Sequence, residues 1–280
     1  MMKLLTVALI LASSMVGRHD PGACLVTGSV SAADGDRARA ACDVARARFQ
    51  DLFGVAAPAL EIVLREQPGY RVSDVGAGAR VYWPTSAALG GSARTGSDPA
   101  RPAQEQWREV LPHEAMHALL AAHFFGAGDD LSAPYGTPLP DWFEEGVAIW
   151  AESDLYRGVR MAQARGLEPR FRVLPEILAG AHPAASNPAL LAARDGAALP
   201  ADDAAVWAFY PQSLAVLGFV YDAGGTSAIQ ALAARLLGES RDTDTLAGLP
   251  GLPATADEVI AAWEAWLPAS GRSGAVVGRP

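Results

Sequence analysis

The chain has 280 residues, of which 50% are hydrophobic and 19% are charged. This composition supplies a core for one large domain or two small ones and excludes an intrinsically disordered chain. The formal net charge is -9, from 22 Lys and Arg against 31 Asp and Glu, and no basic run offers a stripe for phosphates. Nucleic acid is therefore not an expected partner.

The first residues have the layout of a secretory signal peptide. Lys3 precedes an apolar run over residues 4–11, and small residues follow. No uninterrupted apolar stretch of the sequence, this run included, reaches the roughly 20 residues of a membrane-spanning helix. The sequence therefore excludes a multi-pass membrane protein. We expect residues 1–17 to be a signal peptide and the mature chain to be secreted or periplasmic, with no membrane span after signal removal. An uncleaved N-terminal anchor is the alternative.

Cys24 and Cys42 are the only cysteines. An exported chain can therefore form one disulfide, which closes a loop of about 19 residues and stabilises the fold by about 3 kcal/mol in the chain-entropy model. Two separate buried thiols in a reducing compartment are the alternative.

The N-terminal part alternates between strand and helix patterns. Residues 24–30 (CLVTGSV) predict a strand, and residues 34–53 predict a helix that ends at Gly54. Residues 60–66 (LEIVLRE) and 79–86 (ARVYWPTS) predict two more strands. On the predicted helix one apolar stripe is expected, made of Ala41, Val44, Ala45, Phe49 and Phe53.

The C-terminal part is predicted to be helical from Gln104 to Leu267, with polar connections at 126–140 and 181–203. We expect one domain over residues 18–269, with an α+β sheet part at 18–102 and a helical part at 103–269. Residues 270–280 predict a flexible tail.

The segment LPHEAMHALL contains a His-Glu-x-x-His motif formed by His113, Glu114 and His117. Positions four apart on a helix lie only about 40° apart around its axis, so both imidazoles can bind one ion. A catalytic zinc keeps three nitrogen or oxygen ligands and a water whose pKa falls toward about 7, and Glu114 would take that water's proton. Pro112 predicts a kink or a new helix start just before the motif. The alternative is that this short pattern arose by chance.

One candidate for a third ligand is His123, whose spacing from the motif is that of metzincins. Metzincin helices break at a glycine so that the third histidine can turn back, and this chain has Leu120 at that position. On a continuous helix His123 lies about 9 Å along the axis from His117 and faces elsewhere. A histidine near a helix end is the alternative role.

The second candidate is Glu145, in the segment LPDWFEEGVAIWAE. Asp141 and Glu144 predict a capping box at the start of this helix, which gives Glu144 a structural role. Gly146 removes a side chain where two helices would have to approach closely for Glu145 to reach the metal, at a cost in helix stability of about 1 kcal/mol. A buried carboxylate requires a partner, and Glu145 shares its inward-facing side with Trp142, Ile149 and Glu152.

HEAMH followed by a connection and WFEEGVAIW resembles the gluzincin zinc metallopeptidases, specifically the peptidase MA-like group related to thermolysin and the M1-type aminopeptidases. In that family the Glu before the Gly of the second helix binds zinc, and here that residue is Glu145. The segments AFYPQSLAVLGFVYDAGG and TADEVIAAWEAWL are also similar to the family, so the resemblance covers residues 60–267. It implies an α+β fold in which a small N-terminal mixed sheet packs on a mostly helical, zincin-like catalytic region.

Some family features are absent or open. The connection between His117 and Glu145 is longer than in M1-type aminopeptidases, and no segment like Gly-Ala-Met-Glu-Asn occurs, so aminopeptidase specificity is not inferred. Tyr210 is similar in position to the tyrosine that hydrogen-bonds the oxyanion in several gluzincins. Core packing is the alternative role for Tyr210, and Tyr221 and Tyr135 are the substitutes.

Together these residues predict a secreted zinc-dependent metallopeptidase that acts on a peptide or protein substrate. His113, His117 and Glu145 would hold Zn2+, and Glu114 would act as the general base on the metal-activated water. One alternative is a metzincin-type peptidase with His123 as third ligand. The other is a zinc-containing binding or scaffold module that cuts nothing. A carboxylate partner for the histidines is expected, and the pattern leaves Glu152 and Asp141 open as candidates.

Overall fold

The structure is a computed structural model that describes residues 24–28, 31–67, 71–72, 79–91, 103–126, 138–183, 204–238 and 242–269. The signal peptide expected at 1–17 and the tail expected at 270–280 lie outside these residues. Within the described ranges, no helix combines the length and apolar character that a membrane crossing requires.

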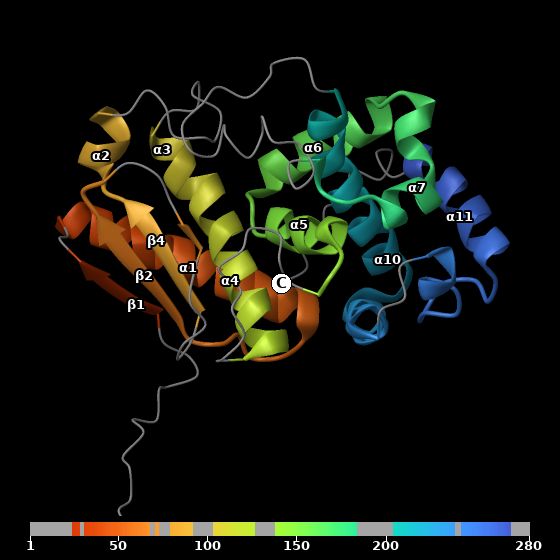
Figure 1. Ribbon diagram of the computed structural model, residues 1–280, viewed down its shortest axis with the longest axis horizontal. Helices are drawn as coiled ribbons and strands as arrows, with labels where there is room; N and C mark the ends of the chain where they lie inside the picture. The colour runs from red at the N-terminus through yellow and green to blue at the C-terminus, as the bar shows by residue number, and fades with distance from the viewer. Residues whose placement is uncertain are drawn as a thin grey trace, which may run out of the picture.

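A four-stranded mixed sheet forms the N-terminal part (Figure 1). Its order is β1 (Cys24–Gly28), β2 (Leu60–Arg65), β4 (Ala79–Pro84) and β3 (Arg71–Val72), where β1, β2 and β4 run parallel and β3 is antiparallel. The three strands expected from the alternation of apolar residues are all present, and the two-residue β3 is an addition. Because strand side chains alternate between faces, one face supplies core residues: Leu60, Ile62, Leu64, Ala79, Val81 and Trp83.

Helix α1 (Ala32–Phe53) connects β1 to its parallel neighbour β2. The Ser31 side chain caps its start by accepting a hydrogen bond from the backbone N–H of Asp34, and Gly54 ends it with a left-handed φ of 66°. The predicted end at Gly54 is confirmed. Val44 was expected in the buried stripe but is 43% exposed, whereas Cys42 is fully buried.

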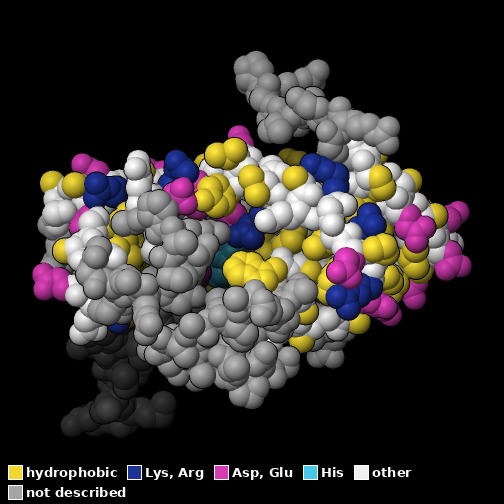
Figure 2. All heavy atoms as spheres, turned by 90° about the horizontal axis from the view of Figure 1, so that it is seen from above, with side chains coloured by type: hydrophobic (Ala, Val, Ile, Leu, Met, Phe, Trp, Pro, Cys, Tyr) yellow, Lys and Arg dark blue, Asp and Glu magenta, His cyan; other side chains and the backbone are white. Residues whose placement is uncertain are grey.

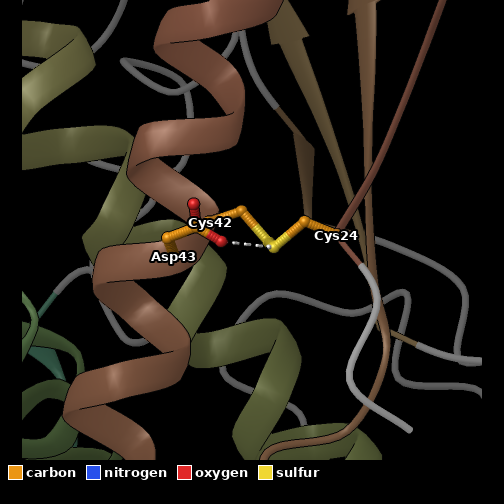
Figure 3. The surroundings of a disulfide bond; sticks show 3 residues. All are labelled: Cys24, Cys42 and Asp43. Atoms are coloured by element: carbon orange, nitrogen blue, oxygen red, sulfur yellow. Dashed lines mark hydrogen bonds between the residues drawn. A yellow bond between two sulfur atoms is a disulfide. The ribbon is translucent and has the colours of Figure 1, made fainter. Parts of the chain in front are cut away.

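A disulfide between Cys24 and Cys42 joins β1 to α1 (Figure 3). This is the pairing that the sequence predicts. A carboxylate oxygen of Asp43 lies 3.4 Å from the sulfur of Cys24. The bridge therefore ties the edge strand of the sheet to the helix that packs behind it.

The remainder of the described chain is helical, and Figure 1 shows α4 and α5 between the sheet and the C-terminal helices. Helix α4 packs against α1, β4 and α5, while α10 packs against α5, α6 and α1. The helical elements are α2 (Ser86–Gly91), α3 (Ala103–Glu105), a π-helical turn (Gln106–Val110), α4 (Leu111–Phe125), α5 (Asp141–Trp150), α6 (Asp154–Gly166), a 3-10 turn (Pro169–Arg172), α7 (Leu174–Ala179), α10 (Ala204–Leu237), a second 3-10 turn (Thr243–Thr245) and α11 (Ala256–Ala269).

The sequence predicted a kink or a new helix start at Pro112. α4 begins at Leu111, but the backbone of Val110 and Leu111 is helical, so the chain changes from one helix type to another without leaving the helical conformation. A π-helical turn over Gln106–Val110 precedes α4, and the backbone N–H of Leu111 donates to the carbonyl oxygen of Gln106, five residues back. Proline has no N–H to donate and is tolerated in a first helical turn. The widened turn thus ends where α4 begins, two residues before His113.

Close contact between α5 and α10 depends on Gly146. A Cβ at this position would lie 2.7 Å from the backbone oxygen of Ser213. The sequence predicted that Gly146 lets α5 approach the helix of the metal site. That prediction is wrong about the partner, because the atoms nearest to a Cβ at Gly146 belong to α10 and not to α4. Farther along α10, Gly225 has a φ of 61° and breaks the helix into two segments.

The predicted fold class is confirmed: the protein is α+β, and a small N-terminal mixed sheet packs against a mostly helical region. One core runs through both parts, from Phe49 on α1 through Trp83 on β4 to Phe143 on α5 and Trp263 on α11. Thr255 and Glu258 form a capping box before α11, since each side chain accepts a hydrogen bond from the other residue's backbone N–H.

Candidate metal centre

Two adjacent helices bring His113, His117 and Glu145 together. The histidines lie one turn apart on α4, and Glu145 lies on α5, which packs directly against α4. One ligand atom from each of the three residues lies within 4.8 Å of the other two. Within the described ranges, this is the one group of His, Cys, Asp and Glu side chains close enough to hold a metal ion.

The distances between these atoms fit the donor set of a zinc ion. Glu145 Oε2 lies 3.3 Å from His113 Nε2, and Glu145 Oε1 lies 3.7 Å from His117 Nε2. A charge-assisted hydrogen bond would be shorter, at about 2.8 Å. Ligands about 2.0–2.1 Å from a tetrahedral zinc lie about 3.4 Å from one another. Glu145 Oε2 is buried and has no well-aligned hydrogen-bond partner, which is the environment of a carboxylate that faces a cation.

Burial and charge act against each other on these three groups. Burial alone would lower the pKa of His113, but the carboxylates of Glu145 and Glu152 outweigh it and raise this pKa to about 10. The pKa of His117 is also raised, because Glu145 outweighs the effect of burial. Burial would raise the pKa of Glu145, and the two histidines instead hold it well below its ordinary value. Glu145 is therefore a carboxylate at neutral pH.

Of the two carboxylates that the sequence left open as partners of the histidines, Glu152 is the one that lies next to His113. Its Oε1 lies 3.3 Å from His113 Nδ1, on the side of the ring away from Glu145. Burial alone would raise the pKa of Glu152, but His113 and Arg160 lower it to about 2. A carboxylate on the second nitrogen of a metal-binding histidine fixes the tautomer and orientation of the ring.

Glu114 follows His113 on α4 and is partly buried, as His117 is, whereas His113 and Glu145 are buried. Its negative charge raises the pKa of both His113 and His117, so the carboxylate acts on both rings. Figure 2 shows a histidine side chain at the bottom of a hollow, next to a Lys or Arg side chain and a hydrophobic one.

His182 was not predicted from the sequence, yet it borders the metal centre. Its Nε2 lies 3.8 Å from Glu145 Oε1 and 3.3 Å from the hydroxyl of Tyr210, and its ring packs edge-on against Phe209 and Tyr210. Burial lowers the pKa of His182, so the ring is neutral at neutral pH. No pattern marks this residue, because it is a single histidine in a polar connection.

Asp141 does not cap α5 as the sequence predicted. Pro140 precedes the helix, and no side chain caps its start. The carboxylate of Asp141 instead accepts a hydrogen bond of 2.6 Å from the backbone N–H of His182. Proline in extended conformation already directs the chain into the helix, so Asp141 is available to hold the His182 segment.

His123 points away from this cluster. Its ring packs against Phe49, Phe53 and Phe124, with ring centres 4.6–6.1 Å apart. Of the substitutes for Tyr210, Tyr221 packs on Trp150, and Tyr135 lies outside the described residues.

No family model, curated protein or solved structure matches the chain.

Proposed function

We propose that this protein is a zinc-dependent metallopeptidase. The observation that carries the proposal is the donor set of His113, His117 and Glu145, whose spacing fits zinc ligands, with Glu114 on the same helix as both histidines. Zinc bound there would supply a Lewis acid that polarises a carbonyl and lowers the pKa of a coordinated water. This set has three protein ligands and no cysteine, which is typical of a catalytic site.

The roles of the other residues follow from their charges and positions. Glu114 is the candidate general base that takes the proton of the attacking water and later returns it to the leaving amine. Tyr210 and the neutral His182 are the candidate donors to the oxyanion that forms from the peptide carbonyl. Their contact with each other, at 3.3 Å, supports assigning them as a pair.

We also propose that the protein acts outside the cytoplasm. The Cys24–Cys42 disulfide supports this proposal, because disulfides persist mainly in oxidising compartments. The layout of residues 1–17 as a secretory signal points the same way.

The direct test of the activity is a comparison of wild type with Glu114→Gln on a library of quenched fluorescent peptides. The variant removes the base and none of the three candidate ligands, so we expect hydrolysis to fall by about 100-fold or more while zinc content stays the same. A wild-type chain that holds zinc and cleaves no peptide or protein would contradict the peptidase proposal and favour a non-catalytic zinc module.

A further inference from the structure

Arg160 is the residue through which α6 reaches the candidate metal centre. Its Nε donates to one carboxylate oxygen of Glu152 at 2.8 Å, and its Nη2 donates to the other at 2.9 Å. Both side chains are largely buried, with 16% of Arg160 and 3% of Glu152 exposed. A guanidinium that contacts both oxygens fixes the plane of a carboxylate as well as its position.

The carboxylate fixed in this way is the one that faces His113. Glu152 Oε1 lies 3.3 Å from His113 Nδ1 and also accepts the hydrogen bond from Arg160 Nη2. Without the guanidinium, the carboxylate would be free to rotate away from the ring. The guanidinium of Arg160 also lies 5.4 Å from the centre of the Tyr210 ring, so it borders a second part of the site.

We propose that Arg160 is a positioning residue for the metal centre. It fixes Glu152, Glu152 fixes the ring of His113, and metal affinity therefore depends on a residue that does not contact the metal. This inference rests on the proposed zinc site. It assigns α6, which carries none of the candidate ligands, a part in metal binding.

Arg157 provides a matched control. It lies on the same helix one turn earlier and has a similar exposed fraction, 14%. Its partners differ: it pairs with Asp154 and lies 5.1 Å from the centre of the Trp150 ring. Replacing Arg157 therefore removes an equally buried guanidinium from α6 without removing the contacts to Glu152.

The experiment measures the zinc affinity of the full chain by competition with a chromophoric chelator. We expect Arg160→Met to weaken zinc binding about 10-fold to 100-fold, as loss of such supporting contacts typically does. Arg157→Met should change it by less than about 3-fold, and adding Arg160→Met to Glu152→Gln should have a similarly small effect, because the influence of Arg160 passes through Glu152. With cobalt in place of zinc, the visible spectrum should change in Arg160→Met and stay the same in Arg157→Met.

The inference would be overturned by an Arg160→Met variant that binds zinc as tightly as wild type. It would also be overturned by an effect of Arg160→Met that adds in full to that of Glu152→Gln. If Arg160→Met fails to fold, Arg160→Lys keeps the charge but loses the planar pair of contacts, and an affinity equal to that of wild type would count against the inference. A wild-type chain that binds no zinc would overturn the proposed function itself, whereas wild-type binding that Arg160→Met leaves unchanged would overturn this inference alone.

Discussion

At His113, the carboxylates of Glu145 and Glu152 oppose the effect of burial on the pKa of the imidazole. In the metal-free protein they raise the pKa of His113 to about 10 from its ordinary 6.5. This pairing stabilises the metal-free fold fully below pH 6.5, and the stabilisation is lost as the pH rises through 10. Zinc binds the neutral ring. At any pH below about 10, zinc binding must therefore displace a proton from His113.

Zinc affinity should therefore rise with pH well above the range of an ordinary histidine. We expect about a tenfold increase per pH unit for each displaced proton between about pH 7 and 8.5, measured by chelator competition. Calorimetry in two buffers of different ionisation enthalpy should detect the released proton. An affinity that is flat above pH 7 would show that His113 titrates as an ordinary histidine.

The third ligand can be tested by a pair of substitutions. Glu145→Ala removes a carboxylate oxygen from the candidate donor set and should weaken zinc binding by about 100-fold or more. His123→Ala should leave zinc affinity unchanged within about 3-fold, because its ring packs among phenylalanines and not with the other two histidines. The reverse pattern would favour the metzincin-type arrangement.

At the residue scale, helical spacing predicted the grouping of His113 and His117, and the inward face of the second helix predicted the approach of Glu145. Periodicity does not locate His182, since it lies outside a long helix and reaches the cluster through its tertiary contact with Asp141. The choice of Glu152 over Asp141 as the partner of His113 likewise depends on the turn after α5, which positions Glu152 beside the ring.

At the element scale, the site depends on how closely α5 and α10 approach. Gly146→Ala would place a Cβ 2.7 Å from the backbone oxygen of Ser213, so a helix must shift. We expect a loss of about 1–3 kcal/mol in the free energy of unfolding, measured by urea denaturation.

Gly158→Ala is the control for this substitution. Gly158 lies within α6, and a Cβ there meets no other atom within 4 Å. The same change should therefore stabilise the protein by up to about 1 kcal/mol, because alanine is the better helix former. Equal unfolding midpoints for Gly146→Ala and wild type would contradict the close approach.

The strands and helices with strong patterns could be predicted from the sequence, and the weaker features could not. Alternation located β1, β2 and β4, whereas β3 has only two residues and no period to detect. Val44 is apolar but falls on the exposed side of α1, because the direction of the buried face is set by what packs against the helix.

At the scale of the whole molecule, the disulfide joins β1 to α1, and the candidate ligands lie on other elements, α4 and α5. Replacing Cys24 and Cys42 by Ser should lower the free energy of unfolding by about 3 kcal/mol. Zinc affinity should change by less than about 3-fold, because the ligands lie on α4 and α5. A reducing agent should lower the unfolding midpoint of wild type and leave that of the double variant unchanged; a wild-type midpoint that does not respond would contradict this role of the bridge.

The central claim is that His113, His117 and Glu145 hold one zinc ion, and the metal content of the purified full chain tests it most directly. Elemental analysis after dialysis without chelator should find about one zinc per chain in wild type and a large loss in His117→Ala. Folded wild-type protein that holds no zinc, and takes up none when zinc is added, would contradict the account.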